Sequence, residues 1–254
     1  MQQPVETIDG WYCFHLFWKV NWPGFRAQKK EVQQQQFGEF KKFLQEFDQN
    51  EQAEQGSWYL FDVSGHKADL GLILFRETLA QLNEIEDRLA KLPLFAFLTE
   101  TDSFVSVGEA GTYSGKPRSE RGWSYVNKHI KPKLPKKPYV SFYPMSKLRI
   151  PGANWYELPY EERQKHMKQH GLIGRRYAGK IWQYITGAIG FDDYEWGVTL
   201  FADDPIVFKK IISEMRYAQA SSLYGEFPYF LVGTYLDQPK LEHLFLDDWK
   251  KSFK

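Results

Sequence analysis

Hydrophobic residues in this chain gather in short runs, which alternate with longer segments in which they recur at helical spacing. The first run, residues 11–18, is rich in aromatic side chains and is typical of a β-strand. Two further strand-like runs, residues 58–63 and 70–75, flank a turn at residues 64–67. The order strand, helix, hairpin is therefore predicted for the beginning of the chain. The helix between the first two strands is indicated by Val32, Phe37, Phe40, Phe43, Leu44 and Phe47.

A second helix and a closing strand complete the first unit and give it the order βαββαβ. The strand is predicted at residues 104–107, and one face of the helix carries Leu79, Leu82, Ile85, Leu89 and Leu92.

The same order of elements recurs from residue 139. Pro205 follows two aspartates and makes a good helix start, which sets the register of the second copy. The elements predicted for this copy are a strand at 140–145, a helix at 160–170, hairpin strands at 182–189 and 194–201, a helix at 205–220 and a strand at 229–235.

This duplication predicts an α+β fold made of two tandem ferredoxin-like repeats, of the dimeric α+β barrel type. The first repeat spans residues 6–107 and the second spans residues 138–254. Their sheets, packed side by side, are expected to form a barrel-like core. Residues 108–137 contain glycine, serine, proline and many charges, and we interpret them as a linker in a position to cover a pocket.

The composition narrows the class of protein. With 254 residues, 43% of them hydrophobic, the chain can bury a full core, and its formal net charge of +1 argues against a nucleic-acid binder that relies on overall basicity. No signal peptide is recognisable in residues 1–10, and no run of about 18 apolar residues predicts a membrane span. The single cysteine, Cys13, lies in an apolar stretch, where we expect a buried and inert thiol. A reducing compartment, the cytoplasm, is the expected location.

Three kinds of polar chemistry meet in one span of the second repeat. Tyr143 opens the segment Tyr-Pro-Met-Ser-Lys-Leu-Arg, a polar helix then ends at His170, and cations recur up to Gln183. A neutral imidazole can ligate iron axially, cations and hydroxyls can bind propionates, and a phenol can donate an electron and a proton. Together these side chains predict a site for an iron porphyrin that carries several carboxylates.

Strand alternation and helix position single out particular side chains. The two-residue period of a strand places Tyr143, Met145 and Lys147 on one face, toward whatever fills the barrel. His170 is expected in the last turn of its helix, where Gly171 stops the helix and lets the imidazole turn toward the barrel.

His166 lies one helical turn before His170 and leaves two alternatives open. The two imidazoles could clamp zinc, although no HExxH pattern and no third ligand is recognisable. The interpretation that we favour for His166 is an exposed polar residue on a helix rich in charges.

These segments resemble the coproheme decarboxylases of the chlorite dismutase superfamily, the heme-synthesis enzymes of Gram-positive bacteria. The likeness covers nearly the whole chain and is densest between residues 143 and 230, where it includes residues 187–196 and 214–217. The resemblance implies the same barrel of ferredoxin-like repeats, with Fe-coproporphyrin III (coproheme) as a substrate that acts as its own redox cofactor and heme b as the product. It assigns the iron to His170 and the catalytic radical to Tyr143.

The resemblance also implies a set of propionate contacts. Gln183 stands where chlorite-splitting members have an arginine, which favours decarboxylation over chlorite chemistry. The family's arginine before the Tyr143 motif is missing, and of Lys128 and His129 we predict Lys128, because a lysine keeps the charge although it loses the bidentate fork. Arg216 is a weaker candidate for the pocket or for a subunit interface. The predicted substrate-binding residues are Tyr143, Pro144, Met145, Ser146, Lys147, Gln183, Ser221 and Lys128.

In the reaction that the resemblance implies, hydrogen peroxide oxidises the iron, Tyr143 becomes a radical, and the radical takes a hydrogen atom from a propionate β-carbon. Carbon dioxide then leaves, and two such events turn coproheme into heme b with two vinyl groups. A homopentamer and a transient contact with the ferrochelatase that makes coproheme are implied in the same way. The alternatives are a heme peroxidase or catalase without decarboxylation, a heme carrier or sensor, and a metal-free dimeric ferredoxin-like binder.

Overall fold

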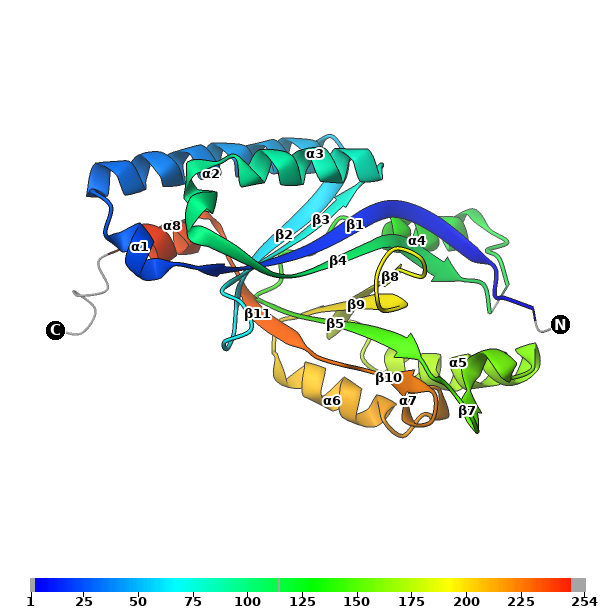
Figure 1. Ribbon diagram of the computed structural model, residues 1–254. Coiled ribbons are helices and arrows are strands. Elements are labelled where there is room, and N and C mark those ends of the chain that lie inside the picture. The colour runs from blue at the N-terminus through cyan, green and yellow to red at the C-terminus, as the bar shows by residue number, and fades with distance from the viewer. Residues whose placement is uncertain (1–2, 114, 248–254) are drawn as a thin grey trace.

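The computed structural model describes residues 3–113 and 115–247. Each half of the chain forms an antiparallel sheet that is covered by helices on one face (Figure 1). The first half contains β1 (Thr7–Val20), α1 (Trp22–Arg26), α2 (Lys30–Gln52), β2 (Gly56–Val63), β3 (Leu70–Arg76), α3 (Leu79–Ala90), η1 (Pro93–Phe97) and β4 (Leu98–Gly111). The remainder contains α4 (Glu120–Ile130), β5 (Tyr139–Lys147), β6 (Arg149–Ile150), β7 (Ala153–Asn154), η2 (Trp155–Glu157), α5 (Tyr160–Arg175), β8 (Ile181–Gly187), β9 (Trp196–Ala202), α6 (Ile206–Met215), α7 (Gln219–Ser222), β10 (Gly225–Glu226), β11 (Leu231–Tyr235) and α8 (Gln238–Leu246).

The two halves share one strand order and close on each other. The first sheet has the order β2-β3-β1-β4, and the second has the equivalent order β11-β5-β9-β8. Strand β2 pairs with β11, and β4 pairs with β8, so the two sheets form a single closed barrel. The prediction of two tandem ferredoxin-like repeats is confirmed by this topology.

The interior of the barrel is filled by aromatic side chains from both halves. Phe142 of β5 stacks against Phe17 of β1 at a ring distance of 5.7 Å and against His15 at 4.1 Å. His15 is fully buried, and its Nε2 lies 2.8 Å from the hydroxyl of Thr199. Burial lowers the pKa of His15 to about 3, so its imidazole is neutral at physiological pH. Because this space is occupied, the barrel interior has no room for a porphyrin.

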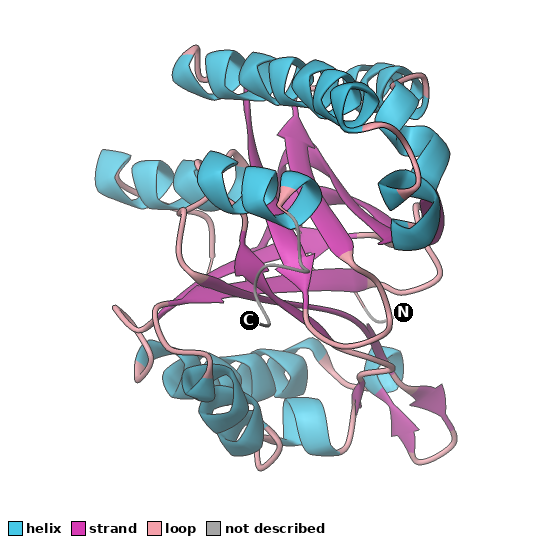
Figure 2. Ribbon diagram, turned by 90° about the vertical axis from the view of Figure 1, so that its left-hand side faces the viewer, coloured by secondary structure: helices cyan, strands magenta, loops and turns pink. Residues whose placement is uncertain are grey.

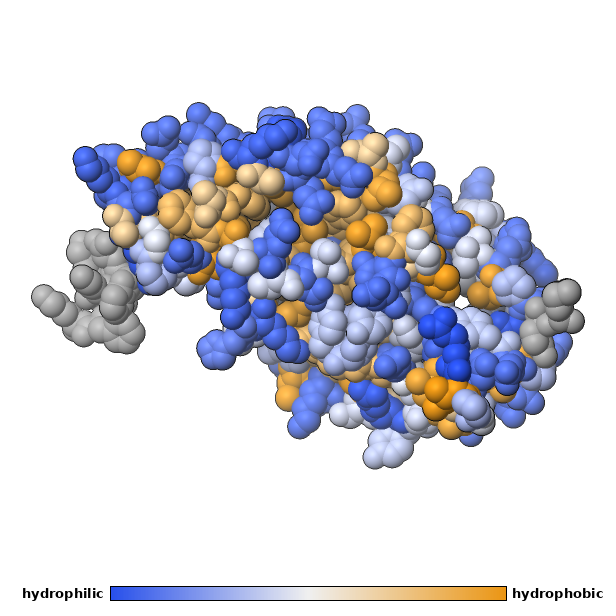
Figure 3. All heavy atoms as spheres, viewed as in Figure 1, coloured by the Kyte–Doolittle hydropathy of each residue, from blue (hydrophilic) through white to orange (hydrophobic). Residues whose placement is uncertain are grey.

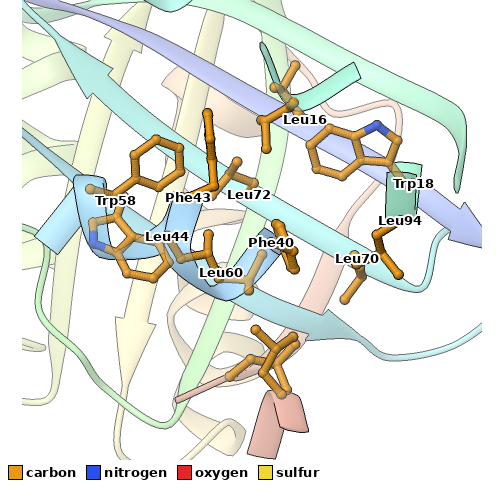
Figure 4. Close-up of a cluster of buried hydrophobic side chains, with 14 of the residues drawn as sticks. Leu16, Trp18, Phe40, Phe43, Leu44, Trp58, Leu60, Leu70, Leu72 and Leu94 are labelled. Carbon is orange, nitrogen blue, oxygen red and sulfur yellow. The ribbon is translucent and has the colours of Figure 1, made fainter. Parts of the chain in front are cut away.

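Helices α2 and α3 cover the outer face of the first sheet. The hydrophobic stripe of α2 packs against strands β1, β2 and β3, and Figure 4 shows Phe40, Phe43 and Leu44 against this sheet. Helix α3 begins with a capping box, in which the Thr78 hydroxyl accepts the backbone N–H of Gln81 and the Gln81 side chain accepts the N–H of Thr78. Both helices were predicted, and their packing gives the first repeat a dense core.

Helices α5 and α6 cover the outer face of the second sheet, on the opposite side of the molecule from α2 and α3 (Figure 2). Their apolar side chains pack on β5 and β9 over only part of that face. The rest of the face, around the end of β5, remains open as a cavity.

The segment between the repeats contains a helix that was not predicted. Residues 108–111 complete β4, and α4 occupies 120–130 with the hydroxyl of Ser119 accepting the N–H of Gly122 at its start. Only Ile130 of this helix is fully buried, and the aromatic side chains of Trp123 and Tyr125 are exposed. The segment 108–137, which we interpreted as a linker, thus contains the end of β4 and helix α4, and α4 lies at the wall of the cavity.

Two glycines let the end of α4 approach the sheet. A Cβ atom at Gly10 in β1 or at Gly108 in β4 would collide with the backbone carbonyl of Ile130. We expect Gly108→Ala to lower the free energy of unfolding by about 1–3 kcal/mol, the usual cost of inserting an atom into a packed site. Urea denaturation measures this change.

The matched control is Gly38→Ala in the middle of α2, where a Cβ meets nothing within 4 Å. This variant should be more stable than the native chain by about 0.5–1 kcal/mol, because glycine is a poor helix former. Equal stability of the Gly108 variant and the native chain would contradict the close approach of α4.

The helix predicted at 205–220 is divided in two. Helix α6 ends at Met215, and Ala218 has extended backbone angles (φ −81°, ψ 131°) before the short α7. Asp204 caps α6, since its carboxylate accepts the N–H of Ile206 at 3.0 Å. The break places Ser221 in α7, near the end of β5, instead of at the end of one long helix.

The surface and the buried thiol complete the description. The face seen in Figure 3 is mainly hydrophilic over α2 and α3, with scattered apolar side chains elsewhere. Among the described residues, none of the helices has both the length and the hydrophobicity that a bilayer crossing requires. Cys13 is fully buried as predicted, and burial raises the pKa of its thiol, which keeps it protonated.

Candidate functional site

A cavity of about 1220 Å³ lies between the outer face of the second sheet and α5, α6 and α7. Strand β5 supplies Tyr143, Met145 and Lys147, and α5 faces them with His170. The predicted strand alternation is confirmed, since these three side chains share a face while Phe142 points into the barrel. The expectation that this face looks into the barrel was wrong, because the aromatic cluster fills the interior.

Lys147 is the last residue of β5, and its side chain is almost completely buried in the cavity wall. Its Nζ donates a hydrogen bond to the carbonyl of Ala220 at 2.5 Å and lies 4.4 Å from the ring centre of Trp155. Burial lowers the pKa of Lys147 to about 8, against an opposing effect of the Glu195 carboxylate. The ammonium group is therefore still mainly charged at neutral pH and has a strong preference for an anion.

His170 presents a neutral imidazole to the same cavity. Burial, assisted by the positive charge of Lys147, lowers the pKa of His170 to about 4. Its Nδ1 is buried and has no hydrogen-bond partner among the described residues. An unprotonated and partly unsatisfied imidazole in a cavity is suited to bind a metal.

The position of His170 differs from the prediction. Helix α5 continues through Gly171 and ends at Arg175, so Gly171 is not the stop that we expected. A glycine inside a helix costs only about 1 kcal/mol, and Ile173 in the added turn packs against the apolar cluster of the second half. His170 thus reaches the cavity from the side of the helix, on a rigid part of it.

Tyr143 lies in the middle of β5 with 5% of its surface exposed. Its ring packs against Phe230 and Phe227 at centroid distances of 4.7 and 5.9 Å. Burial raises the pKa of the Tyr143 phenol, while the nearby Arg216 opposes this change. The phenol therefore stays protonated at neutral pH, and its aromatic neighbours fix the orientation of the ring.

Several cations and polar groups line the remaining walls. Gln183 of β8 and the buried Ser221 of α7 face the cavity as predicted. Arg216 also lines it, with its guanidinium 4.5 Å from the ring centre of Phe227. Three cations of α5 that were not predicted as site residues also line the cavity: Lys165, Lys168 and Arg175.

Three of the predicted substrate-binding residues do not reach the cavity. Lys128 is exposed and outside the lining, whereas its neighbour His129 lines the cavity with Nδ1 2.7 Å from the carbonyl of Tyr125. Helix α4 turns the Lys128 side chain to solvent and brings His129 to the cavity wall. Pro144 and Ser146 point to the opposite face of β5, and the Ser146 hydroxyl accepts the N–H of Glu195 at 3.2 Å.

His166 is half-buried instead of exposed. Its ring packs between Trp155 and Tyr224, at centroid distances of 6.2 and 5.8 Å, and it is not part of the cavity wall. Within the described residues, no three histidine, cysteine or acidic side chains come together to hold a metal ion. The zinc alternative thus has no third ligand.

The arrangement suits a large, flat, anionic ligand that carries a metal. Aromatic side chains provide the walls, five cations can meet carboxylates, and His170 can hold a metal from one side. The five cations are Lys147, Lys165, Lys168, Arg175 and Arg216. The chemistry of these residues fits an iron porphyrin with several propionates.

Comparison with known protein families shows to which family the chain belongs. The family model for chlorite dismutase matches residues 33–236, which is most of the chain. The chain belongs to the chlorite dismutase family. A curated member of this family, the coproheme decarboxylase of Staphylococcus carnosus (strain TM300), is 46% identical over 250 residues, which cover 96% of this chain and 99% of that protein.

Two solved structures have a similar fold. A heme-binding protein from Thermus thermophilus is 40% identical and covers 96% of this chain and 98% of its own, with a TM-score of 0.93. A variant of chlorite dismutase from Candidatus Nitrospira defluvii has a TM-score of 0.77 at 18% identity, over 94% of this chain and 96% of that one. The second likeness shows the fold alone.

Proposed function

We propose that the protein is a coproheme decarboxylase, which converts Fe-coproporphyrin III to heme b by oxidative decarboxylation of two propionates with hydrogen peroxide. The observation that carries this proposal is the meeting of His170, Tyr143 and Lys147 in one cavity. A metal ligand, a redox-active phenol and a carboxylate-binding ammonium are the three functions that the reaction needs. The curated relative with 46% identity, which is named a coproheme decarboxylase, supports the same activity.

In this proposal His170 binds the iron of coproheme and the opposite walls bind its carboxylates. Lys147, with a charge buried in the wall, is the strongest propionate contact, and Ser221 and Gln183 add neutral hydrogen bonds. Met145, which lines the cavity between Tyr143 and Lys147, contacts the porphyrin ring. His129, rather than Lys128, takes the place of the arginine that the family resemblance implies before the Tyr143 motif.

Tyr143 is the residue that we propose to react with the substrate. The iron of the substrate, when bound, transmits the oxidising power of hydrogen peroxide. Tyr143 loses an electron and its phenolic proton and then accepts a hydrogen atom from the β-carbon of a propionate, which restores the phenol. Loss of one further electron and of carbon dioxide leaves a vinyl group. Each event consumes one propionate carboxylate, one hydrogen peroxide and one proton, and yields one vinyl group, one carbon dioxide and two water molecules.

The role of the protein is to place the reacting groups. The propionate must lie within roughly 3–3.5 Å of the phenolic oxygen for efficient transfer. Lys147 lies on the same face of β5 as Tyr143, with Met145 between them, so one strand fixes both the carboxylate and the phenol. The buried phenol keeps its proton until oxidation, since its pKa is raised.

We also propose that the protein works in the cytoplasm as a homopentamer and receives coproheme by transient contact with a ferrochelatase. The hairpin of β8 and β9 carries exposed apolar side chains that are available for a contact between subunits. They are Ile189 and Phe191.

Mass spectrometry after addition of hydrogen peroxide to the coproheme complex tests the proposed activity. We expect the Soret band to shift on coproheme binding and the porphyrin to lose two carboxyl groups as carbon dioxide, with about two equivalents of peroxide consumed per heme b, as the stoichiometry above requires. Peroxide consumption without a change in porphyrin mass would favour a peroxidase or catalase. Binding without either change would favour a carrier or sensor, and no binding would reject the heme site altogether.

A further inference from the structure

Glu195 is a buried carboxylate that lies behind the cavity, not in it. It precedes β9, and its side chain is 9% exposed. It lines a separate, smaller cleft of about 320 Å³ together with Arg149 and Tyr156. Burying a carboxylate is unfavourable unless strong hydrogen bonds compensate for the lost water, so its partners indicate what it does.

The main partner of Glu195 is the backbone of Lys147. The carboxylate Oε2 accepts the N–H of Lys147 at 2.7 Å, a buried hydrogen bond between residues 48 positions apart in the sequence. The regular pairing of β5 with β9 ends at Met145 and Trp196. The amide of Lys147 lies beyond this last pair, so the Glu195 side chain continues the strand pairing by one step.

Glu195 also contacts residues on either side of Lys147 in the chain. Its backbone N–H donates to the carbonyl of Met145 at 3.0 Å, and its Oε1 lies 3.8 Å from the guanidinium of Arg149. Burial, assisted by the Glu195 carboxylate, raises the pKa of the nearby Tyr156 phenol. Tyr156 follows Trp155, the residue whose ring lies below the ammonium group of Lys147. Glu195 therefore contacts the main chain of Lys147, the carbonyl of Met145 before it and the guanidinium of Arg149 after it.

We infer that Glu195 is a positioning residue: by accepting the N–H of Lys147, it holds the end of β5 so that the Lys147 ammonium meets a substrate propionate. This inference rests on the proposed function, in which Lys147 binds the propionate next to Tyr143. Glu195 itself does not touch the substrate, because it is absent from the lining of the large cavity. Its negative charge also opposes the lowering of the Lys147 pKa by burial, which favours the charged form of the lysine.

A double-mutant cycle between Glu195 and Lys147 tests the inference. Glu195→Met keeps the length of the side chain and removes the acceptor, and Lys147→Ala removes the group that Glu195 is inferred to hold. The dissociation constant of coproheme is measured by absorption titration at about pH 6, below the pKa of about 8 to which burial lowers Lys147, so that Lys147 is charged in the native protein. We expect Glu195→Met to weaken binding roughly tenfold, the scale of a hydrogen bond to a charged group, but less than about twofold in the Lys147→Ala background.

Two further variants separate positioning from a general loss of structure. Glu195→Gln retains a carbonyl oxygen that can accept the Lys147 N–H, and it should bind coproheme within about threefold of the native protein, since this bond is largely kept. Glu226→Met carries the same substitution on the exposed neighbour of Ser146 in β10, and it should leave coproheme binding and turnover unchanged. Thermal unfolding of each variant establishes that it is folded at the temperature of the titration.

The outcomes distinguish this inference from the proposed function. If the native protein binds and decarboxylates coproheme but the effects of Glu195→Met and Lys147→Ala on binding are additive, the role of Glu195 is overturned. The proposed function is not affected by this outcome. Binding by Glu195→Gln that is as weak as that of Glu195→Met also overturns the role of Glu195. A native protein that does not bind coproheme rejects the proposed function before the cycle is measured.

Discussion

Replacing Tyr143 by phenylalanine should abolish decarboxylation and leave coproheme bound. The phenylalanine ring can keep the packing against Phe227 and Phe230, so the fold and the cavity wall are retained. The variant loses only the hydroxyl, which in the proposed reaction gives up its hydrogen and takes one from the substrate. We expect product formation to fall by at least about 100-fold, as is usual when a group that transfers hydrogen is removed.

Binding should change much less than turnover. A single neutral hydrogen bond contributes about 0.5–1.5 kcal/mol, so the dissociation constant of coproheme should rise by no more than about tenfold. Absorption titration measures binding, and mass spectrometry after peroxide addition measures carbon dioxide loss from the porphyrin.

The control for this prediction is Tyr139→Phe. Tyr139 lies at the start of the same strand, β5, belongs to the same apolar cluster and does not line the cavity. This variant should decarboxylate coproheme at the native rate. Full turnover by Tyr143→Phe would show that the hydrogen acceptor is another residue.

Replacing His170 by alanine should remove the axial bond to the iron of coproheme. The imidazole is neutral at physiological pH, because burial and the Lys147 charge lower its pKa to about 4, so it is ready to bind the metal without first losing a proton. Loss of groups that merely orient a metal ligand costs about 10–100-fold in metal affinity, and loss of the ligand itself should cost at least as much. We expect weaker binding of ferric coproheme, a different electron paramagnetic resonance spectrum, and little conversion to heme b.

Added imidazole and a second histidine variant control for indirect effects. Imidazole can enter the space that His170→Ala vacates and should restore the spectrum of the native complex. His166→Ala removes a ring from the same helix, one turn earlier and outside the cavity wall, and should bind coproheme as the native protein does. An unchanged spectrum in His170→Ala would assign the iron to another ligand.

Local periodicity was sufficient to predict the architecture of this protein. Short aromatic runs with two-residue alternation indicated strands, and apolar residues at helical spacing indicated α2 and α3, because each pattern follows from burying one face of one element. Repetition of βαββαβ then led to two ferredoxin-like units, and the topology confirms them. The same alternation placed Tyr143, Met145 and Lys147 on one face of β5, which now forms a wall of the cavity.

Local patterns were less informative where the position of a helix depends on contacts with distant parts of the chain. Helix α4 has little buried surface, and its position depends on Gly10 and Gly108, which lie in strands of the first half. Because the orientation of α4 was unknown, the choice between Lys128 and His129 had no structural basis. The end of α5 was placed too early because Ile173 gains its stabilising contacts only after the helix packs on the sheet.

The sequence by itself determined the order of the elements, the duplicated fold and the residue types of the candidate site, since these depend on side-chain spacing along single strands and helices. Only the tertiary structure decided which side of the second sheet carries the cavity. Barrel closure buries Phe142 and its aromatic neighbours inside, so Tyr143 and Lys147 must face the helices outside. It also decided the contact between Glu195 and Lys147, because a hydrogen bond across 48 residues exists only once two strands have paired in register.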